Sequence, residues 1–171
     1  MVGPTFDRTA SHARFIAHRR RMHLSMDFRP GIRDWLRDAR ELGLACAVAS
    51  SSPLRWVGEH LSRVGAFDMF DVVATGEEVA AHKPDPAVYL LALDRLGTTA
   101  SASLAVEDTP HGVAAARGAG MATVAIPNPF VDVAQVGAAD VVLRSAADLP
   151  LADVITRLSG RWRVPARGPY A

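Results

Sequence analysis

The chain has 171 residues, the size of one ordinary globular domain, and its 49% hydrophobic and 22% charged residues are enough for a buried core. Its 19 basic and 18 acidic side chains give a formal net charge of +1, which argues against nucleic acid or an anionic membrane as the main partner. A single cysteine and the absence of any apolar run near the roughly 18 residues of a membrane span favour a cytoplasmic protein with no membrane segment and no disulfide.

Helices and short apolar strands are expected to alternate along the chain. The first helix is expected over Ser11–Met26, with Ser11 as its cap, and its basic cluster is typical of a solvated face. After Pro30-Gly31, an amphipathic helix is expected to end near Gly43. The order then expected is strand 44–49, helix 54–64, strand 72–74, helix 86–96, strand 104–106, helix 110–119, strands 122–126 and 141–143, and helix 151–158.

This alternation predicts an α/β fold with a mostly parallel sheet, because parallel strands are joined by helical crossovers. Ligands of such sheets bind beyond the carboxyl ends of the strands. The residues that directly follow each strand are therefore the candidates for chemistry.

Two strand ends offer groups that suit an anion. Ser50, Ser51 and Ser52 follow the first strand, where hydroxyl and backbone N–H groups can hold an anion, although serine is also common in loops. Lys83 follows the second strand and precedes Pro84, which restricts its backbone. A lysine held there can balance the charge of a phosphate, whereas the simpler interpretation is a surface lysine in a proline-rich loop.

The third strand runs directly into Glu107 and Asp108. Two carboxylates at the end of a buried strand are costly unless they are paired or bind a cation. Asp108 could instead cap the helix that begins at Pro110. With the serines and the lysine, the pair indicates a site for phosphate and Mg²⁺.

The ordered set of these segments resembles the haloacid dehalogenase (HAD) superfamily, in its β-phosphoglucomutase and phosphoglycolate phosphatase branch. The likeness extends over about residues 29–158. The segments that carry it are 29–32 (RPGI), 47–52 (AVASSS), 82–86 (HKPDP), 106–116 (VEDTPHGVAAA) and 118–121 (GAGM).

The resemblance implies a three-layer Rossmann-like core and a Mg²⁺-dependent hydrolase that acts on a small phosphorylated metabolite, such as a sugar phosphate. It implies that Ser50, with Ser51, binds the phosphoryl group, that Lys83 offsets charge, and that Asp108 binds Mg²⁺ with Glu107 as ligand or orienting residue. It also implies that Gly112 permits close packing where the next helix starts.

The chain departs from the family at the first motif. The family begins with a central strand that ends in Asp-x-Asp, whose first Asp is the nucleophile, and no Asp-x-Asp occurs here. Either that strand and most of a helical cap are missing, or Asp7 in the segment 6–11 (FDRTAS) is a degenerate first motif and the nucleophile. The first alternative leaves two inner sheet edges unpaired, between the strands that end at Ser50 and Glu107.

The expected organisation is a cap remnant over residues 1–28, a partial HAD-like core over 29–160, and a loose tail over 161–171. The main interpretation is a phosphatase by the inherited chemistry of the family, with the activity of this chain by itself left open because the first motif is absent. The alternative is a non-catalytic module that binds phosphate or a complementing chain, and association into a homo-oligomer is compatible with open sheet edges. No Gly-x-Gly-x-x-Gly follows a strand, which argues against a dinucleotide-binding protein.

Overall fold

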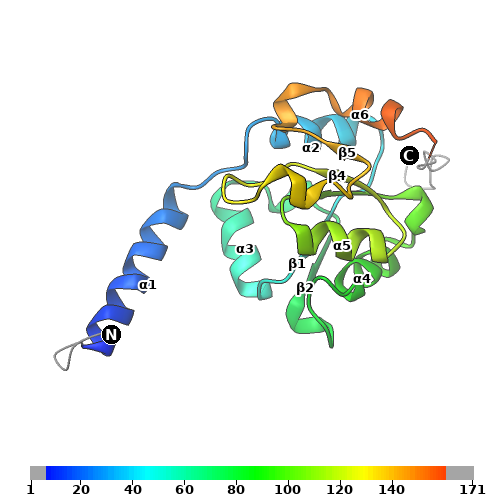
Figure 1. The fold of residues 1–171 in the computed structure, drawn as a ribbon. Helices are drawn as coiled ribbons and strands as arrows, with labels where there is room; N and C mark the ends of the chain where they lie inside the picture. The colour runs from blue at the N-terminus through cyan, green and yellow to red at the C-terminus, as the bar shows by residue number, and fades with distance from the viewer. Residues whose placement is uncertain (1–6, 161–171) are drawn as a thin grey trace.

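A computed structural model describes residues 7–160 of the chain (Figure 1). The expected tail over 161–171 lies outside the described residues. Five short strands alternate with helices as the sequence predicts. The elements are α1 (Arg8–Ser25), α2 (Ile32–Glu41), β1 (Ala47–Ser50), α3 (Leu54–Arg63), β2 (Val72–Thr75), α4 (Ala87–Leu96), β3 (Leu104–Glu107), α5 (Pro110–Gly118), β4 (Ala122–Ala125), β5 (Val141–Val142) and α6 (Leu151–Arg157).

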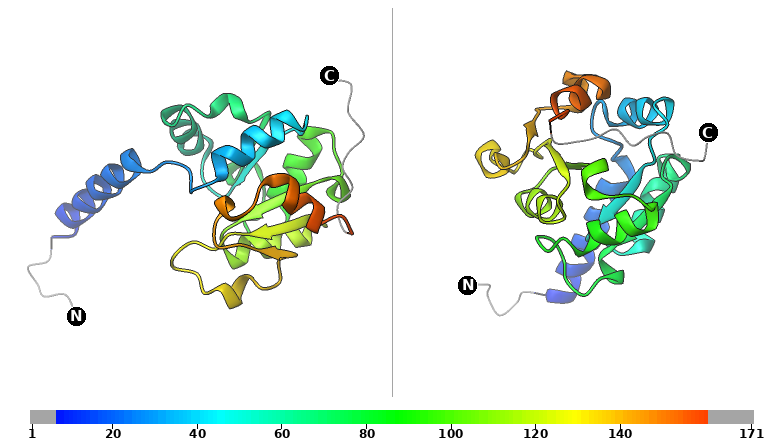
Figure 2. Two further views of the ribbon diagram at one scale, coloured as in Figure 1. Left: turned by 90° about the horizontal axis from the view of Figure 1, so that it is seen from above. Right: turned by 90° about the vertical axis from the view of Figure 1, so that its right-hand side faces the viewer.

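Helices cover both faces of the strands, so the core has three layers (Figures 1 and 2). On one face, α2 and α6 pack over β4 through a cluster that includes Trp35, Val124 and Val154. On the other face, α4 and α5 pack over β1, β2 and β3 through a cluster that includes Val88 and Ala115. The small alanines of these clusters bring the helices close to the strands.

The strands form two separate parallel ladders. One ladder pairs β1 with β2, from Ala47 opposite Val72 to Ser50 opposite Thr75. The other has the order β3-β4-β5. Strands β1 and β3 are not paired with each other, so each presents an open edge. No strand within residues 7–160 lies between them.

Helix α1 projects away from the body of the molecule (Figures 1 and 2). Its first turn is capped by Asp7, whose Oδ1 accepts a hydrogen bond of 3.0 Å from the Ala10 N–H. Ser11 was the expected cap, and that prediction is wrong because the helix begins at Arg8, three residues earlier. No helix within residues 7–160 is both long enough and apolar enough to cross a membrane.

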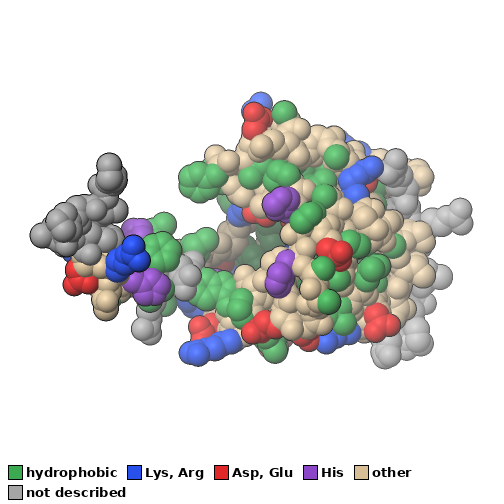
Figure 3. Space-filling view, turned by 60° about the horizontal axis from the view of Figure 1, so that its bottom comes forward, with side chains coloured by type: hydrophobic (Ala, Val, Ile, Leu, Met, Phe, Trp, Pro, Cys, Tyr) green, Lys and Arg blue, Asp and Glu red, His purple; other side chains and the backbone are tan. Residues whose placement is uncertain are grey.

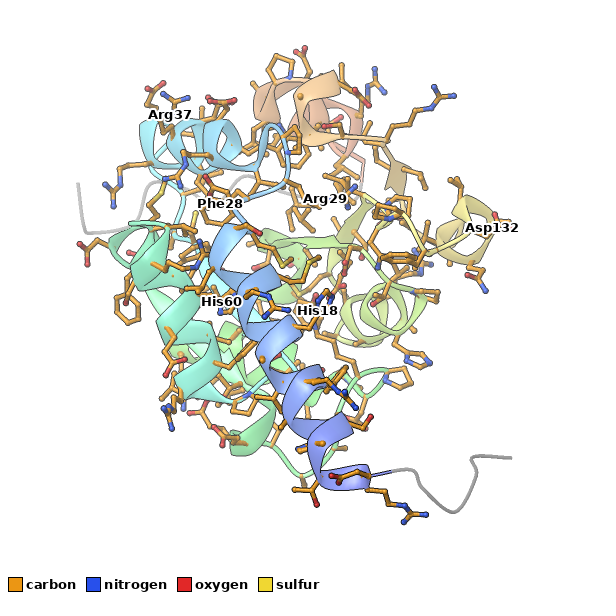
Figure 4. All side chains as sticks on the ribbon, turned by 90° about the vertical axis from the view of Figure 1, so that its left-hand side faces the viewer. His18, Phe28, Arg29, Arg37, His60 and Asp132 are labelled. Carbon is orange, nitrogen blue, oxygen red and sulfur yellow. The ribbon has the colours of Figure 1, made fainter. Side chains whose placement is uncertain are left out.

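The segment between α1 and α2, residues 26–31, is held against the body of the molecule by contacts of Arg29 and Arg33. Arg29, labelled in Figure 4, donates to the carbonyl oxygens of Ile126 and Pro127 at 2.5 and 3.0 Å. Arg33 forms an ion pair of 3.2 Å with Asp27 and lies over the ring of Phe28. These contacts hold the segment beside the carboxyl end of β4.

Acid is expected to weaken the fold through Glu78, which follows β2. Hydrogen bonds from Arg95, and then from the side chain and backbone of Thr75, lower the pKa of Glu78 to about 2. Because this is below its ordinary value of 4.5, the carboxylate stabilises the folded state above pH 4.5, and that contribution is lost as the pH falls towards 2. We expect the melting temperature to fall more steeply between about pH 5 and pH 2 in the wild type than in Glu78→Gln. Parallel curves for the two proteins would contradict this assignment.

Candidate functional site

A hollow of about 430 Å³ lies at the carboxyl ends of β1 and β3, where the fold predicts a ligand. Figure 3 shows that the body of the molecule is hollowed on the side that faces α1, with hydrophobic, acidic and histidine side chains around the hollow. The residues that line it are Val48, Ala49, Ser50, Ser51, Ser52, Lys83, Val106, Glu107, Asp108 and Thr109. The structure thus brings together every site residue expected at the strand ends.

The serine loop after β1 is held by its own hydrogen bonds. The Ser50 hydroxyl oxygen accepts from the Ser52 N–H at 3.1 Å, which leaves its hydrogen available to donate to an anion. Ser51 is exposed at the rim. A Cβ on Gly76 would come within 2.7 Å of the Ser51 carbonyl oxygen, so the absence of a side chain there lets the next loop pack against the serines.

Lys83 lies between the two ladders and is largely buried. Its Nζ donates to Glu107 Oε1 at 2.5 Å, to the Ala49 carbonyl oxygen at 2.9 Å and to the Tyr89 hydroxyl at 3.4 Å. Only 13% of the Lys83 side chain and 6% of the Glu107 side chain are exposed to solvent. The alternative of a surface lysine in a proline-rich loop is therefore wrong. Lys83 is also the one lysine in the sequence, since the other 18 basic residues are arginines.

Tyr89 of α4 completes this cluster, and sequence reasoning did not identify it. Its hydroxyl donates to Glu107 Oε1. Burial, and then the charge of Glu107, raise the pKa of Tyr89 far above its ordinary value, so the phenol keeps its proton and stays a donor. Tyr89 and Lys83 together fix the direction of the Glu107 carboxylate.

Of the two adjacent carboxylates, Asp108 is the one that is exposed to the hollow. Thr109 is the residue that caps α5, because its Oγ1 accepts from the Gly112 N–H at 3.1 Å. The alternative that Asp108 caps this helix is therefore wrong. The Asp108 carboxylate is exposed at the hollow and accepts one contact of 3.3 Å from Asn128 Nδ2. Asn128 follows β4, so the same rule of strand ends could have found it.

Gly112 fits closely against Glu107. A Cβ built on Gly112 would lie 1.7 Å from Glu107 Oε2, so any side chain would collide with the carboxylate. The close approach that the family resemblance implied at this position is present. It holds Glu107 between α5 on one side and the Lys83 amine on the other.

Asp7 lies elsewhere. It caps the far end of α1, which projects away from the body, and it does not line the hollow (Figure 1). The structure therefore does not bring Asp7 together with Ser50, Lys83 and Asp108. As the nucleophile of this hollow, Asp7 has no geometric support.

Of the acidic pair, only Asp108 has a carboxylate available to bind a hard divalent cation. Asp108 offers an exposed carboxylate, whereas both Glu107 oxygens are already used, Oε1 by Lys83 and Tyr89 and Oε2 by the Asp108 N–H at 3.2 Å. Across residues 7–160, no three His, Cys, Asp or Glu side chains gather as a metal cluster. A cation such as Mg²⁺, which keeps several waters, would be held by Asp108 with Glu107 as its orienting neighbour.

Comparison with known proteins places these residues in a family. The model of the haloacid dehalogenase-like hydrolases matches residues 4–126. The chain is 39% identical over 133 residues to YhcW of Bacillus subtilis, which is named as a phosphatase. This match covers 78% of this chain and 60% of YhcW. It is 38% identical over 92 residues to a phosphorylated carbohydrates phosphatase of Thermotoga maritima, covering 54% of this chain and 43% of that protein.

A solved structure shows the same fold. A mutant of CbbY from Rhodobacter sphaeroides, in complex with xylulose-1,5-bisphosphate, has 39% sequence identity and a TM-score of 0.68, covering 72% of this chain and 57% of that chain. This chain thus spans between about two fifths and three fifths of the length of these relatives. The match to the family model and the shared parallel core lead to one assignment: the chain belongs to the haloacid dehalogenase-like hydrolase family.

Proposed function

We propose that the hollow binds the phosphoryl group of a small phosphorylated sugar, and that the chain is the phosphate-binding and charge-neutralising part of a Mg²⁺-dependent phosphatase. One observation carries this proposal: Ser50 at the end of β1, Lys83 after β2 and Asp108 after β3 line a single hollow of about 430 Å³. Phosphoryl transfer needs positioned charge more than elaborate covalent chemistry. A donor, an amine and a cation-binding carboxylate supply that charge.

Each residue has a distinct part in this proposal. The Ser50 hydroxyl and the N–H groups of its loop donate to the phosphoryl oxygens. The Lys83 amine places a positive charge at the inner wall of the hollow. Asp108 holds Mg²⁺, which neutralises phosphate charge when bound, and Glu107 keeps the lysine in place. Among the residues that line the hollow, the carboxylates are Glu107 and Asp108, so we place the nucleophile outside this set.

The relatives support the substrate class. One is named for phosphorylated carbohydrates, and another binds xylulose-1,5-bisphosphate. The residues that line the hollow lie within the part of the chain that matches the family model, residues 4–126. A small phosphorylated sugar is therefore the class to test first.

The proposal is tested by binding of inorganic phosphate, measured by calorimetry with and without Mg²⁺. We expect the wild type to bind phosphate in a Mg²⁺-dependent way and Asp108→Asn to weaken that binding about 100-fold, because a bound cation contributes several kcal/mol of charge stabilisation. Asp94→Asn, an exposed carboxylate on α4, is the matched control and should bind as the wild type does. Binding that ignores Mg²⁺, or that both variants leave unchanged, would contradict the proposal.

Release of phosphate from an aryl phosphate adds a test of Asp7. We expect Asp7→Asn to leave any Mg²⁺-dependent hydrolysis unchanged, because Asp7 caps α1 away from the hollow. A loss of hydrolysis in Asp7→Asn would make Asp7 the nucleophile and would show that α1 folds back onto the site.

A further inference from the structure

Asn128, in the loop after β4, contacts the acidic end of β3 through both its side chain and its backbone. Its side-chain Nδ2 donates to Asp108 Oδ2 at 3.3 Å and to the Asp108 carbonyl oxygen at 3.4 Å. Its backbone N–H donates to the same carbonyl oxygen at 3.2 Å. Within residues 7–160, Asn128 is the one side chain that donates a hydrogen bond to the Asp108 carboxylate. The direction of this carboxylate therefore depends on Asn128.

The surrounding structure fixes the position of Asn128. Arg29 donates to the carbonyl oxygens of Ile126 and Pro127, the two residues that precede Asn128 in the chain. After Asn128 the chain turns, and Asn128 Oδ1 accepts a hydrogen bond of 3.0 Å from the Phe130 N–H. The two ends of the amide therefore have separate partners. Its oxygen stabilises the turn, and its nitrogen contacts Asp108.

A neutral amide is a suitable partner for a carboxylate that binds a cation. The contact uses Asp108 Oδ2 and leaves Oδ1 for the metal. Glu107, in contrast, is paired with the Lys83 amine, whose positive charge would repel a cation. Carboxylates that bind metals are usually hydrogen-bonded in turn, and loss of such a partner typically lowers metal affinity by about 10–100-fold. Asn128 can therefore orient Asp108 without competing with the cation for its charge.

We propose that Asn128 is the positioning residue of the cation site, whose amide holds the Asp108 carboxylate in the direction in which it binds Mg²⁺. This inference rests on the proposed function, because it takes Asp108 as the residue that binds Mg²⁺. The simpler alternative is that Asn128 only stabilises the turn at Phe130. The two parts can be separated by experiment, because the turn uses the amide oxygen and Asp108 uses the amide nitrogen.

The first test compares Mg²⁺ affinity in Asn128→Ser and the wild type, measured by titration of the ¹⁵N-labelled full chain with Mg²⁺ alone. A serine keeps an oxygen that can accept from the N–H two residues further on, but it places no amide at Asp108. We expect Asn128→Ser to weaken Mg²⁺ binding about tenfold, with a melting temperature close to that of the wild type. Gln135→Ser removes the same amide from an exposed position in the next turn and should bind Mg²⁺ as the wild type does.

The same titration reports on the Asn128 side chain directly. Asn128 is the one asparagine and Gln135 the one glutamine in the sequence, so the wild-type ¹⁵N spectrum contains two pairs of side-chain amide signals. We expect Mg²⁺ to shift the Asn128 pair with the same midpoint as the Asp108 backbone amide, because the amide nitrogen contacts the carboxylate that binds the cation. The Gln135 pair should stay in place and serves as the control within one sample.

A second variant, Asn128→Ala, removes the contacts of both the amide oxygen and the amide nitrogen. We expect it to weaken Mg²⁺ binding as much as Asn128→Ser does. A loss of affinity in Asn128→Ala alone would overturn the inference, because Asn128 would then act through the turn. Equal Mg²⁺ affinity in the wild type and both variants would also overturn it, while Mg²⁺ binding that Asp108→Asn abolishes would leave the proposed function standing. No Mg²⁺ binding by the wild type would overturn the inference and the proposed Mg²⁺ site together.

Discussion

Replacing Lys83 with methionine is expected to lower the free energy of unfolding by about 3–5 kcal/mol, the usual cost of leaving a buried charge without its partner. The reason is Glu107, whose side chain is 6% exposed and which would keep only the Tyr89 hydroxyl and the Asp108 N–H as donors. Urea denaturation of wild type and variant measures the loss.

A double variant separates this charge effect from a simple loss of packing. In Lys83→Met/Glu107→Gln the buried charge is gone, so we expect the double variant to be more stable than Lys83→Met alone. If the losses in free energy of unfolding from the two single substitutions instead add up in the double variant, Lys83 and Glu107 are not energetically coupled. The contact of 2.5 Å between them would then not stabilise the fold.

Gly112→Ala is expected to destabilise the protein by about 1–3 kcal/mol, the usual cost of an extra methyl group in a packed site. Its Cβ would lie 1.7 Å from Glu107 Oε2, so the carboxylate must move away from Lys83 or α5 must shift. Thermal or urea unfolding measures the effect, and phosphate binding should weaken together with stability.

Gly118→Ala is the matched control, since it adds the same methyl group to the same helix. Its Cβ would lie 3.6 Å from Pro86, an ordinary contact, and alanine favours a helix over glycine by up to about 1 kcal/mol. We expect Gly118→Ala to be neutral or stabilising. Equal losses from the two variants would show that the α5 backbone, and not the Glu107 contact, sets the cost.

The sequence predicted the α/β alternation and the location of the site, because strand ends in a parallel sheet converge on one edge. The serines after β1, Lys83 after β2 and the acidic pair after β3 all line the hollow for this reason. A break in the sheet between β1 and β3 was also expected, since no Asp-x-Asp occurs in the sequence. In the part of the chain that the structure describes, β1 and β3 belong to separate ladders.

The remaining features depend on side-chain contacts that spacing does not encode. Tyr89 contacts Glu107 across eighteen positions of the chain, and nothing in its local pattern marks it. Asp108 was the candidate cap for α5 in the sequence, and only the geometry of the turn assigns this part to Thr109. Ser11 was expected to cap α1, but Asp7 offers the same chemistry earlier in the chain.

The most direct test of the proposed phosphate site is a titration of the ¹⁵N-labelled chain with inorganic phosphate and Mg²⁺, followed by the backbone amide signals. We expect the largest shifts in the serine loop at Ser50, Ser51 and Ser52 and at Asp108 and Thr109, and we expect Asp108→Asn to remove them. Shifts confined to the basic helix α1, or no shifts at any phosphate concentration in a folded protein, would contradict the proposed site.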